Sequence, residues 1–108
     1  TGTTVGDKRE LEALISVLEQ TSVRGKKLVS IGSIKSNIGH CKTSAGIVGL
    51  IKAVCAVNRR VIPPTCSIRT PNPAFGASIL RPATLGEISD VHASLRAGVS
   101  AFGFGGIN

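Results

Sequence analysis

The first 20 residues place apolar side chains at helical spacing among polar ones. The apolar positions that follow this spacing are Leu11, Leu14, Ile15 and Leu18. Their i, i+3, i+4, i+7 period predicts an amphipathic helix. Asp7 and Glu10 have the spacing of a capping box, so we expect Asp7 to cap this helix. The glycines Gly2 and Gly6 are then expected to lie in a loop before it.

The centre of the chain predicts a strand, a polar turn and a second helix. Residues 28–34 form an apolar run that is typical of a buried strand. The polar stretch from Lys35 to His40 is expected to turn. Thr43 or Ser44 can then cap a helix over residues 45–57, whose apolar side chains lie on nearly every side. Such a helix is normally buried inside a larger body. Its apolar surface is larger than two or three strands can cover.

The remainder of the chain is less regular. A short apolar pair, Val61 and Ile62, ends at two prolines, and residues 71–73 indicate an irregular loop. Residues 74–94 predict no clear element. The alternation from Leu95 to Phe102 predicts a strand, and residues 103–106 predict a sharp glycine turn. The order of helices and strands indicates an α/β architecture.

Charge adds a weak preference for anionic partners. The chain has 13 Lys+Arg against 6 Asp+Glu, a net charge of +7. A basic surface attracts phosphates, nucleic acid or acidic proteins. The basic residues are scattered, however, and no aromatic platform stands among them, which argues against a nucleic-acid groove. No apolar run is long enough to span a membrane.

The cysteines Cys41, Cys55 and Cys66 are odd in number and form no C-x-x-C pair. A disulfide framework or a metal site is therefore not expected. Unpaired thiols fit a reducing, cytoplasmic setting. A dyad of His40 with Cys41 is also disfavoured, because neighbouring residues at a helix start point to different faces. We expect all three cysteines to be packed thiols.

The segment from Gly32 to His40 is the best candidate for chemistry. Open α/β folds usually bind ligands between the end of a strand and the start of the next helix. The phosphate motifs of this region fail, since position 37 is Asn37 where a P-loop needs glycine. His40, near a helix start, can donate a hydrogen bond from its neutral ring to a developing oxyanion. A structural histidine bonded to a backbone carbonyl is an equally good interpretation.

Several motifs occur together in one order. Residues 1–10 carry T-G-T, G-D and E, residues 32–40 are G-S-I-K-S-N-I-G-H, and residues 45–52 are A-G-I-V-G-L-I-K. I-P-P-T, P-N-P and S-A-F-G-F-G-G-I-N follow at residues 62–65, 71–73 and 100–108. In this order and spacing the chain closely resembles the β-ketoacyl synthase (ketosynthase) domain of type I polyketide synthases.

The resemblance implies an α/β thiolase-like fold, with residues 1–108 as a fragment covering most of the second, C-terminal half. It implies one incomplete domain, because the family's nucleophilic cysteine lies upstream and none of the three cysteines matches it. The full-length protein is then expected to be a cytoplasmic homodimer, and the fragment alone to be inactive.

The resemblance also implies a reaction. The parent enzyme would be an acyltransferase that joins acyl thioesters to malonyl-type extender units by decarboxylative Claisen condensation, in polyketide or fatty acid biosynthesis. It would bind no cofactor or metal itself. Its substrates would arrive on the phosphopantetheine arm of an acyl carrier protein, and the positive charge of this chain suits such a carrier, which is usually acidic.

The family's functional residues carry over to five positions of this sequence. His40 matches the second active-site histidine, and Lys35 matches the lysine that holds and tunes it. Thr1 and Thr3 match the threonines that hydrogen-bond the phosphopantetheine arm. Phe104 matches a gating position beside the nucleophile. The resemblance therefore implies two catalytic and three substrate-binding residues.

Two other hypotheses stay open. A non-condensing homologue, such as a malonyl decarboxylase-like protein or a chain-length factor, keeps His40 while its nucleophile is replaced. A basic module that binds anions or nucleic acid is the weaker of the two, for the charge pattern given above.

Overall fold

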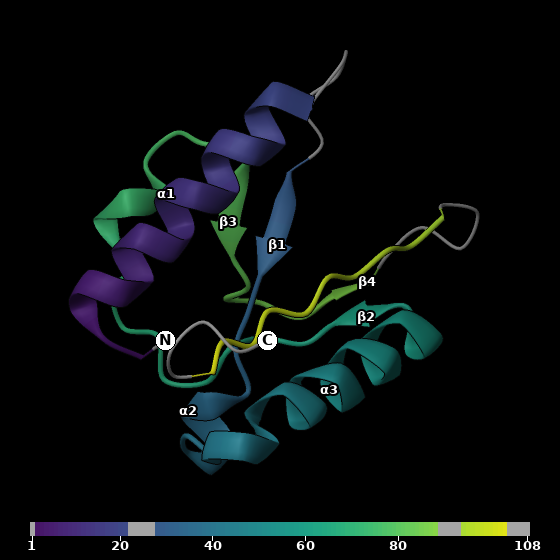
Figure 1. The fold of residues 1–108 in the computed structure, drawn as a ribbon. Coiled ribbons are helices and arrows are strands. Elements are labelled where there is room, and N and C mark those ends of the chain that lie inside the picture. Colours follow the sequence, from purple (N-terminus) through teal and green to yellow (C-terminus); the bar gives the residue numbers. More distant parts are fainter. Residues whose placement is uncertain (1, 22–27, 89–93, 104–108) are drawn as a thin grey trace. The chain divides into compact units, whose positions relative to one another are not determined.

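The computed structural model describes residues 2–21, 28–88 and 94–103. The chain divides into two compact units, one formed by residues 1–31 and 68–82 and the other by residues 32–67 and 83–108 (Figure 1). Among the described residues, no helix has the length and apolar character needed to cross a membrane.

The first unit contains a helix, a two-stranded sheet and a short turn. Strand β1 (Val29–Ile31) runs parallel to β3 (Leu80–Pro82), with Val29 opposite Leu80. Parallel pairing of distant strands is typical of α/β folds. Helix α1 (Thr4–Thr21) contacts the 3-10 turn η2 (Pro73–Phe75). Among the described residues of this unit, Leu11, Ile79 and Leu80 are buried.

Helix α1 confirms the predicted amphipathic face but begins earlier than predicted. Leu11 is buried, and the other three residues of its apolar stripe are half-buried. The helix starts at Thr4, so Gly6 is helical and Asp7 does not cap it. The hydroxyl oxygen of Thr3 instead accepts a hydrogen bond from Gly6 N at 3.1 Å, while Asp7 Oδ1 accepts from Gly2 N at 2.8 Å. Thr3 is therefore the side chain that satisfies the first turn.

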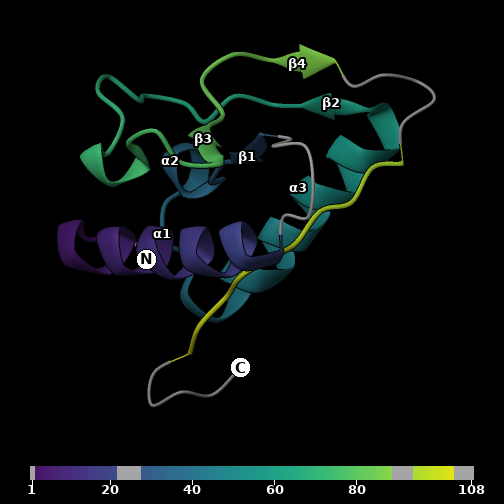
Figure 2. The same cartoon turned by 90° about the horizontal axis from the view of Figure 1, so that it is seen from above.

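The second unit contains two helices, a 3-10 turn and an antiparallel strand pair. Helix α2 (Lys35–Ile38) is a single turn, and η1 (Lys42–Ser44) leads directly into α3 (Ala45–Arg59). Strand β2 (Val61–Ile62) pairs with β4 (Glu87–Ile88), so that Val61 lies opposite Ile88. Figure 1 and Figure 2 show β2 returning along α3 after a reversal at the helix end.

Several local predictions around these elements were wrong. The strand expected over residues 28–34 is limited to β1, and the turn expected after it contains α2. Ser44 precedes α3 without a side-chain capping bond, because η1 already supplies the approach to the helix. Residues 74–94, which predicted no element, contain β3 and β4, each too short to leave a periodic signal.

Helix α3 carries more apolar surface than the described chain covers, as its sequence predicted. None of its residues is buried. The large apolar side chains that stay between 47% and 58% exposed are Ile47, Leu50, Ile51 and Val54. A helix that is apolar on most sides normally packs inside a larger body.

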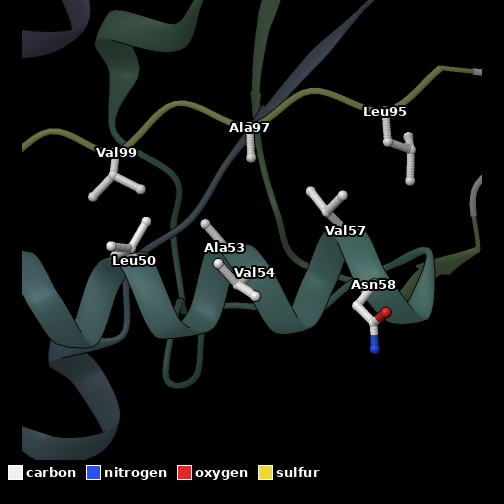
Figure 3. A pocket seen from close by; sticks show the side chains of 8 residues that line it. All are labelled: Leu50, Ala53, Val54, Val57, Asn58, Leu95, Ala97 and Val99. Atoms are coloured by element: carbon white, nitrogen blue, oxygen red, sulfur yellow. The ribbon is translucent and has the colours of Figure 1, made fainter.

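Residues 94–103 run extended along α3, but they form no strand, which corrects the prediction over residues 95–102. The close approach uses glycine: a Cβ on Gly49 would lie 3.2 Å from Val99 Cγ1. An open apolar groove of about 390 Å³ lies between the helix and this segment. In Figure 3, Leu50 and Val57 point toward the extended segment and Asn58 points away. The glycine turn predicted at residues 103–106 extends outside the described residues.

Candidate active site

The segment between β1 and α3 is built from backbone hydrogen bonds. Asn37 N donates to Ile34 O at 2.9 Å, and Gly39 N donates to Lys35 O at 2.8 Å, which closes α2. Gly39 has φ 74° and ψ −176°, a conformation that is essentially restricted to glycine. Helix α2 therefore ends at Gly39, and His40 stands immediately beyond the helix.

Lys35 and His40 lie at the two ends of this turn. Lys35 is the first residue of α2 and is half-buried, whereas His40 follows Gly39 and is exposed. Both come from the second unit. The described residues therefore leave the imidazole open to solvent.

The hydrogen bonding of His40 fixes its neutral tautomer. Lys42 N donates to His40 Nδ1 at 3.1 Å. Because a neutral imidazole has one donor and one acceptor nitrogen, the proton lies on Nε2 when Nδ1 accepts. Within the described part of the chain, Nδ1 is the ring atom that bonds to the protein. The ring can therefore present Nε2–H as a donor.

The neighbouring thiol takes no part in a dyad. Cys41 is half-buried, and its Sγ lies 3.7 Å from Ile38 O and 3.8 Å from Gly39 O, which accept from it. His40 and Cys41 thus have different partners, as predicted. Cys55 and Cys66 are exposed, so the expectation that all three thiols are packed was wrong for these two.

A polar network that the sequence did not reveal holds the start of the segment. Ser33 N donates to Thr65 Oγ1 at 3.0 Å, and Lys52 Nζ donates to Ser33 O at 3.2 Å. Asn37 Nδ2 donates to Cys66 Sγ at 3.1 Å. Desolvation by burial lowers the pKa of Lys52, and a Coulombic interaction with Cys66 partly opposes this shift. The sequence signal that could have predicted this network is Lys52, the one charged residue within the apolar run of residues 45–57.

Of the three predicted substrate-binding residues, the structure describes one. Thr3 lies in the first unit, where its hydroxyl caps α1. Thr1 and Phe104 lie outside the described residues. Among the described residues there is no group of three or more histidine, cysteine or carboxylate side chains able to hold a metal ion.

Comparison with known proteins places the chain in a family. The sequence profile of the β-ketoacyl synthase C-terminal domain matches residues 1–69. The chain belongs to the β-ketoacyl synthase family. This agrees with the motifs on which the predicted resemblance rested, four of which, at residues 1–10, 32–40, 45–52 and 62–65, lie inside the matched range.

Polyketide synthases are among the similar sequences. A highly reducing polyketide synthase of Arthrinium phaeospermum is 45% identical over 112 residues, covering 100% of this chain and 4% of that protein. A phenolphthiocerol/phthiocerol polyketide synthase of Mycobacterium tuberculosis is 42% identical over 111 residues, covering 100% of this chain and 6% of that protein. The chain therefore spans only a small part of the curated relatives it matches.

Solved ketosynthases share the fold. Ketosynthase twelve of the bacillaene polyketide synthase from Bacillus amyloliquefaciens matches with a TM-score of 0.87 and 37% identity, covering 98% of this chain and 19% of that chain. The module 6 ketosynthase of the bacillaene synthase from Bacillus subtilis 168 matches with a TM-score of 0.76 and 37% identity, covering 86% of this chain and 17% of that one. The predicted thiolase-like α/β fold is confirmed, and these matches favour a synthase over a basic nucleic-acid-binding module.

Proposed function

We propose that residues 1–108 are the C-terminal part of the ketosynthase domain of a type I polyketide synthase and supply His40 and Lys35 to its condensing site. The domain's nucleophilic cysteine would come from the part of the parent protein that precedes this chain. The chain is then one component of a β-ketoacyl-[acyl carrier protein] synthase, which is an acyltransferase.

The proposed reaction balances as a decarboxylative condensation. The bond from the malonyl α-carbon to its carboxylate breaks, CO₂ leaves, and the electron pair becomes an enolate. The α-carbon attacks the acyl-cysteine carbonyl, forming a carbon–carbon bond. The carbon–sulfur bond then breaks, and the cysteine leaves as a thiolate that takes up a proton. Both thioester oxygens gain negative charge on the way, so hydrogen-bond donors fixed before the reaction lower the barrier.

One observation carries the role of His40: Lys42 N donates to Nδ1, which leaves the hydrogen of the neutral ring on Nε2. A neutral donor can stabilise an enolate oxygen without first losing a proton. Lys35 stands at the other end of the same turn and would hold and tune the imidazole. Between Gly32 and Lys52 the sequence has three lysines and no acidic residue, which favours developing negative charge.

The substrates of the parent enzyme would be acyl and malonyl-type thioesters on the phosphopantetheine arm of an acyl carrier protein. Thr1 and Thr3 would bind that arm, and Phe104 would gate the nucleophile. A homodimer in the cytoplasm completes the proposal. The net charge of +7 supports an acidic carrier as partner.

The test uses the full-length synthase and measures two steps apart: acylation of the nucleophile, and condensation with a malonyl carrier thioester. We expect His40→Ala to lower condensation about 10²- to 10³-fold, the usual loss of one oxyanion donor, while acylation persists. His40→Gln places an amide N–H₂ near the Nε2 position and should retain more activity than His40→Asn, which places it near Nδ1. His92→Gln, a change of the other histidine, is the control. Equal activity of the Ala, Gln and Asn variants at position 40 would refute a donor role for Nε2.

A further inference from the structure

Ser33 is held through both polar groups of its backbone. Its N–H donates to Thr65 Oγ1 at 3.0 Å, and its carbonyl accepts from Lys52 Nζ at 3.2 Å. The two partners come from different parts of the second unit, the loop after β2 and helix α3. The Ser33 hydroxyl in turn accepts from Lys35 N at 3.2 Å. A residue held at both backbone groups fixes the direction in which the chain enters α2.

The loop after β2 also holds the far side of Lys35. Asn37 Nδ2 donates to Cys66 Sγ at 3.1 Å, next to the residue that binds Ser33. Thr65 N donates at 2.8 Å to the carbonyl of Ala83, whose side chain is 0% exposed. Ser33 and Asn37, which flank Lys35, therefore bond to the neighbouring residues of the 65–66 pair. The first residue of that pair is itself hydrogen-bonded to the buried Ala83.

The geometry at Gly32 shows how tightly Thr65 approaches the segment. A Cβ on Gly32 would lie 2.9 Å from Thr65 Oγ1, closer than real side chains come, and 3.5 Å from Lys52 Nζ. A larger residue would push the hydroxyl away from Ser33. The close approach is therefore part of the arrangement that leads into Lys35 and His40.

Lys52 keeps this arrangement at an electrostatic cost. Its ammonium is half-buried beside Ser33 O, and desolvation lowers its pKa. A methionine of similar length would fill the same space in an apolar helix without that cost. The hydrogen bond to Ser33 is the interaction that only the cation provides.

We propose that Thr65 and Lys52 are positioning residues of the condensing site: by holding Ser33, they set where Lys35 and His40 stand. This inference rests on the proposed function. Neither residue touches the reacting atoms in this role; both act through the backbone that carries the catalytic pair.

The test again uses the full-length synthase with acylation and condensation measured separately. Thr65→Val keeps the shape but removes the acceptor for Ser33, Thr65→Ser keeps the hydroxyl, and Lys52→Met removes the donor. Thr70→Val and Lys8→Met, at exposed positions, are the matched controls. We expect Thr65→Val and Lys52→Met to lower condensation about 10- to 100-fold, the scale of a misplacement of about 1 Å, with acylation and thermal midpoint near wild type. Thr65→Ser should restore most of the condensation rate.

The outcomes separate the two proposals. If His40→Ala abolishes condensation while Thr65→Val and Lys52→Met retain wild-type rates, the positioning inference fails and the proposed function stands. If Thr65→Ser is as damaged as Thr65→Val, or if both steps fall equally, the hydroxyl does not position the site and the inference is overturned. Should Thr65→Val fail to fold, Lys52→Met decides by the same split. If His40→Ala leaves condensation intact, the proposed function itself fails.

Discussion

The two long helices begin in different ways. Before α1, the hydroxyl of Thr3 accepts from Gly6 N, and Asp7 accepts from Gly2 N, so side chains satisfy the first turn. Before α3, Ser44 makes no side-chain capping bond, and the chain arrives through η1. The helices also differ in cover, because α1 buries Leu11 whereas α3 buries none of its residues.

This difference teaches where polar side chains are available for chemistry. Around the start of α1 they serve the helix itself. Before α3, the direction of the chain is set by backbone bonds, by Gly39 and by distant partners of Ser33, so the side chain of Lys35 is not needed as a cap. The ring of His40 accepts from Lys42 N through Nδ1, which leaves Nε2 available. The apolar surface of α3 supplies the complementary feature, a helix suited to burial beneath such a segment.

The strongest test of the contrast between the helices is a matched pair of valines. Val54 in α3 is 58% exposed and Val17 in α1 is 59% exposed. In the full-length synthase we expect Val54→Asp to cost about 3–5 kcal/mol, the penalty of an uncompensated buried charge, because the rest of the protein would cover α3. Val17→Asp should cost no more than about 1 kcal/mol, as for an exposed helix position near the C-terminus. Thermal unfolding of both variants measures this; similar midpoints would mean that the Val54 face stays in water.

A second test asks whether backbone conformation positions His40. Gly39 and Gly98 both have open space where a Cβ would go, but Gly39 alone of the two has a positive φ, 74°. Gly39→Ala should therefore cost about 1–3 kcal/mol of strain and lower condensation, since His40 follows directly. Gly98→Ala, the control, should leave both stability and rate nearly unchanged. Unfolding midpoints and condensation rates of the two variants decide; equal behaviour would remove the role of the Gly39 turn.

Local periodicity predicted more of this fold than long-range pairing did. The stripe containing Leu11 and Leu18 gave α1, and the apolar run of residues 45–57 gave α3, because each repeats over several turns. Strand β3 includes Arg81 and Pro82 and is defined by its pairing with β1. The residues around β3 carry no sequence pattern that predicts this pairing. The alternation after Leu95 reflects packing on α3, which sequence alone does not separate from a sheet.

In the candidate site, too, local sequence motifs predicted more than long-range contacts did. Motif resemblance identified Lys35 and His40, and the structure adds the tautomer through a backbone donor that has no sequence signature. Lys52 and Thr65 were missed because their bonds join residues 19 and 32 positions apart. The prediction of Asp7 as the cap of α1 was wrong because Asp7 and Glu10, three residues apart, mimic a capping box. The observed cap, Thr3, has glycine three residues later, where a capping box needs Glu or Gln, so it leaves no such signal.

A third, smaller effect is expected at the start of α1. Thr3→Ala should destabilise the parent protein by about 1 kcal/mol, because Gly6 N loses its acceptor, whereas Thr3→Ser keeps the cap. If Thr3 also binds the phosphopantetheine arm, Thr3→Ala should raise the KM for the carrier-bound extender beyond any change in Thr3→Ser. Thermal midpoints measure the first effect and steady-state kinetics the second. Unchanged stability in Thr3→Ala would contradict the capping role.

The smallest effect concerns pH and the lysine of α3. Desolvation lowers the pKa of Lys52 in the folded protein below its ordinary value of 10.5. Between the folded value and 10.5 the unfolded chain binds more protons, so stability rises with pH in that window. The contribution is fully present above 10.5 and is lost as pH falls through the folded pKa. The thermal midpoint of wild type minus that of Lys52→Met should therefore grow as pH is raised toward 10.5. Lys8→Met is the control for loss of an exposed lysine, because a surface pair such as Lys8 with Glu12 contributes little to stability. A difference for Lys52→Met that shrinks with rising pH would mean that burial does not penalise the cation, and the electrostatic cost of holding Ser33 would have no basis.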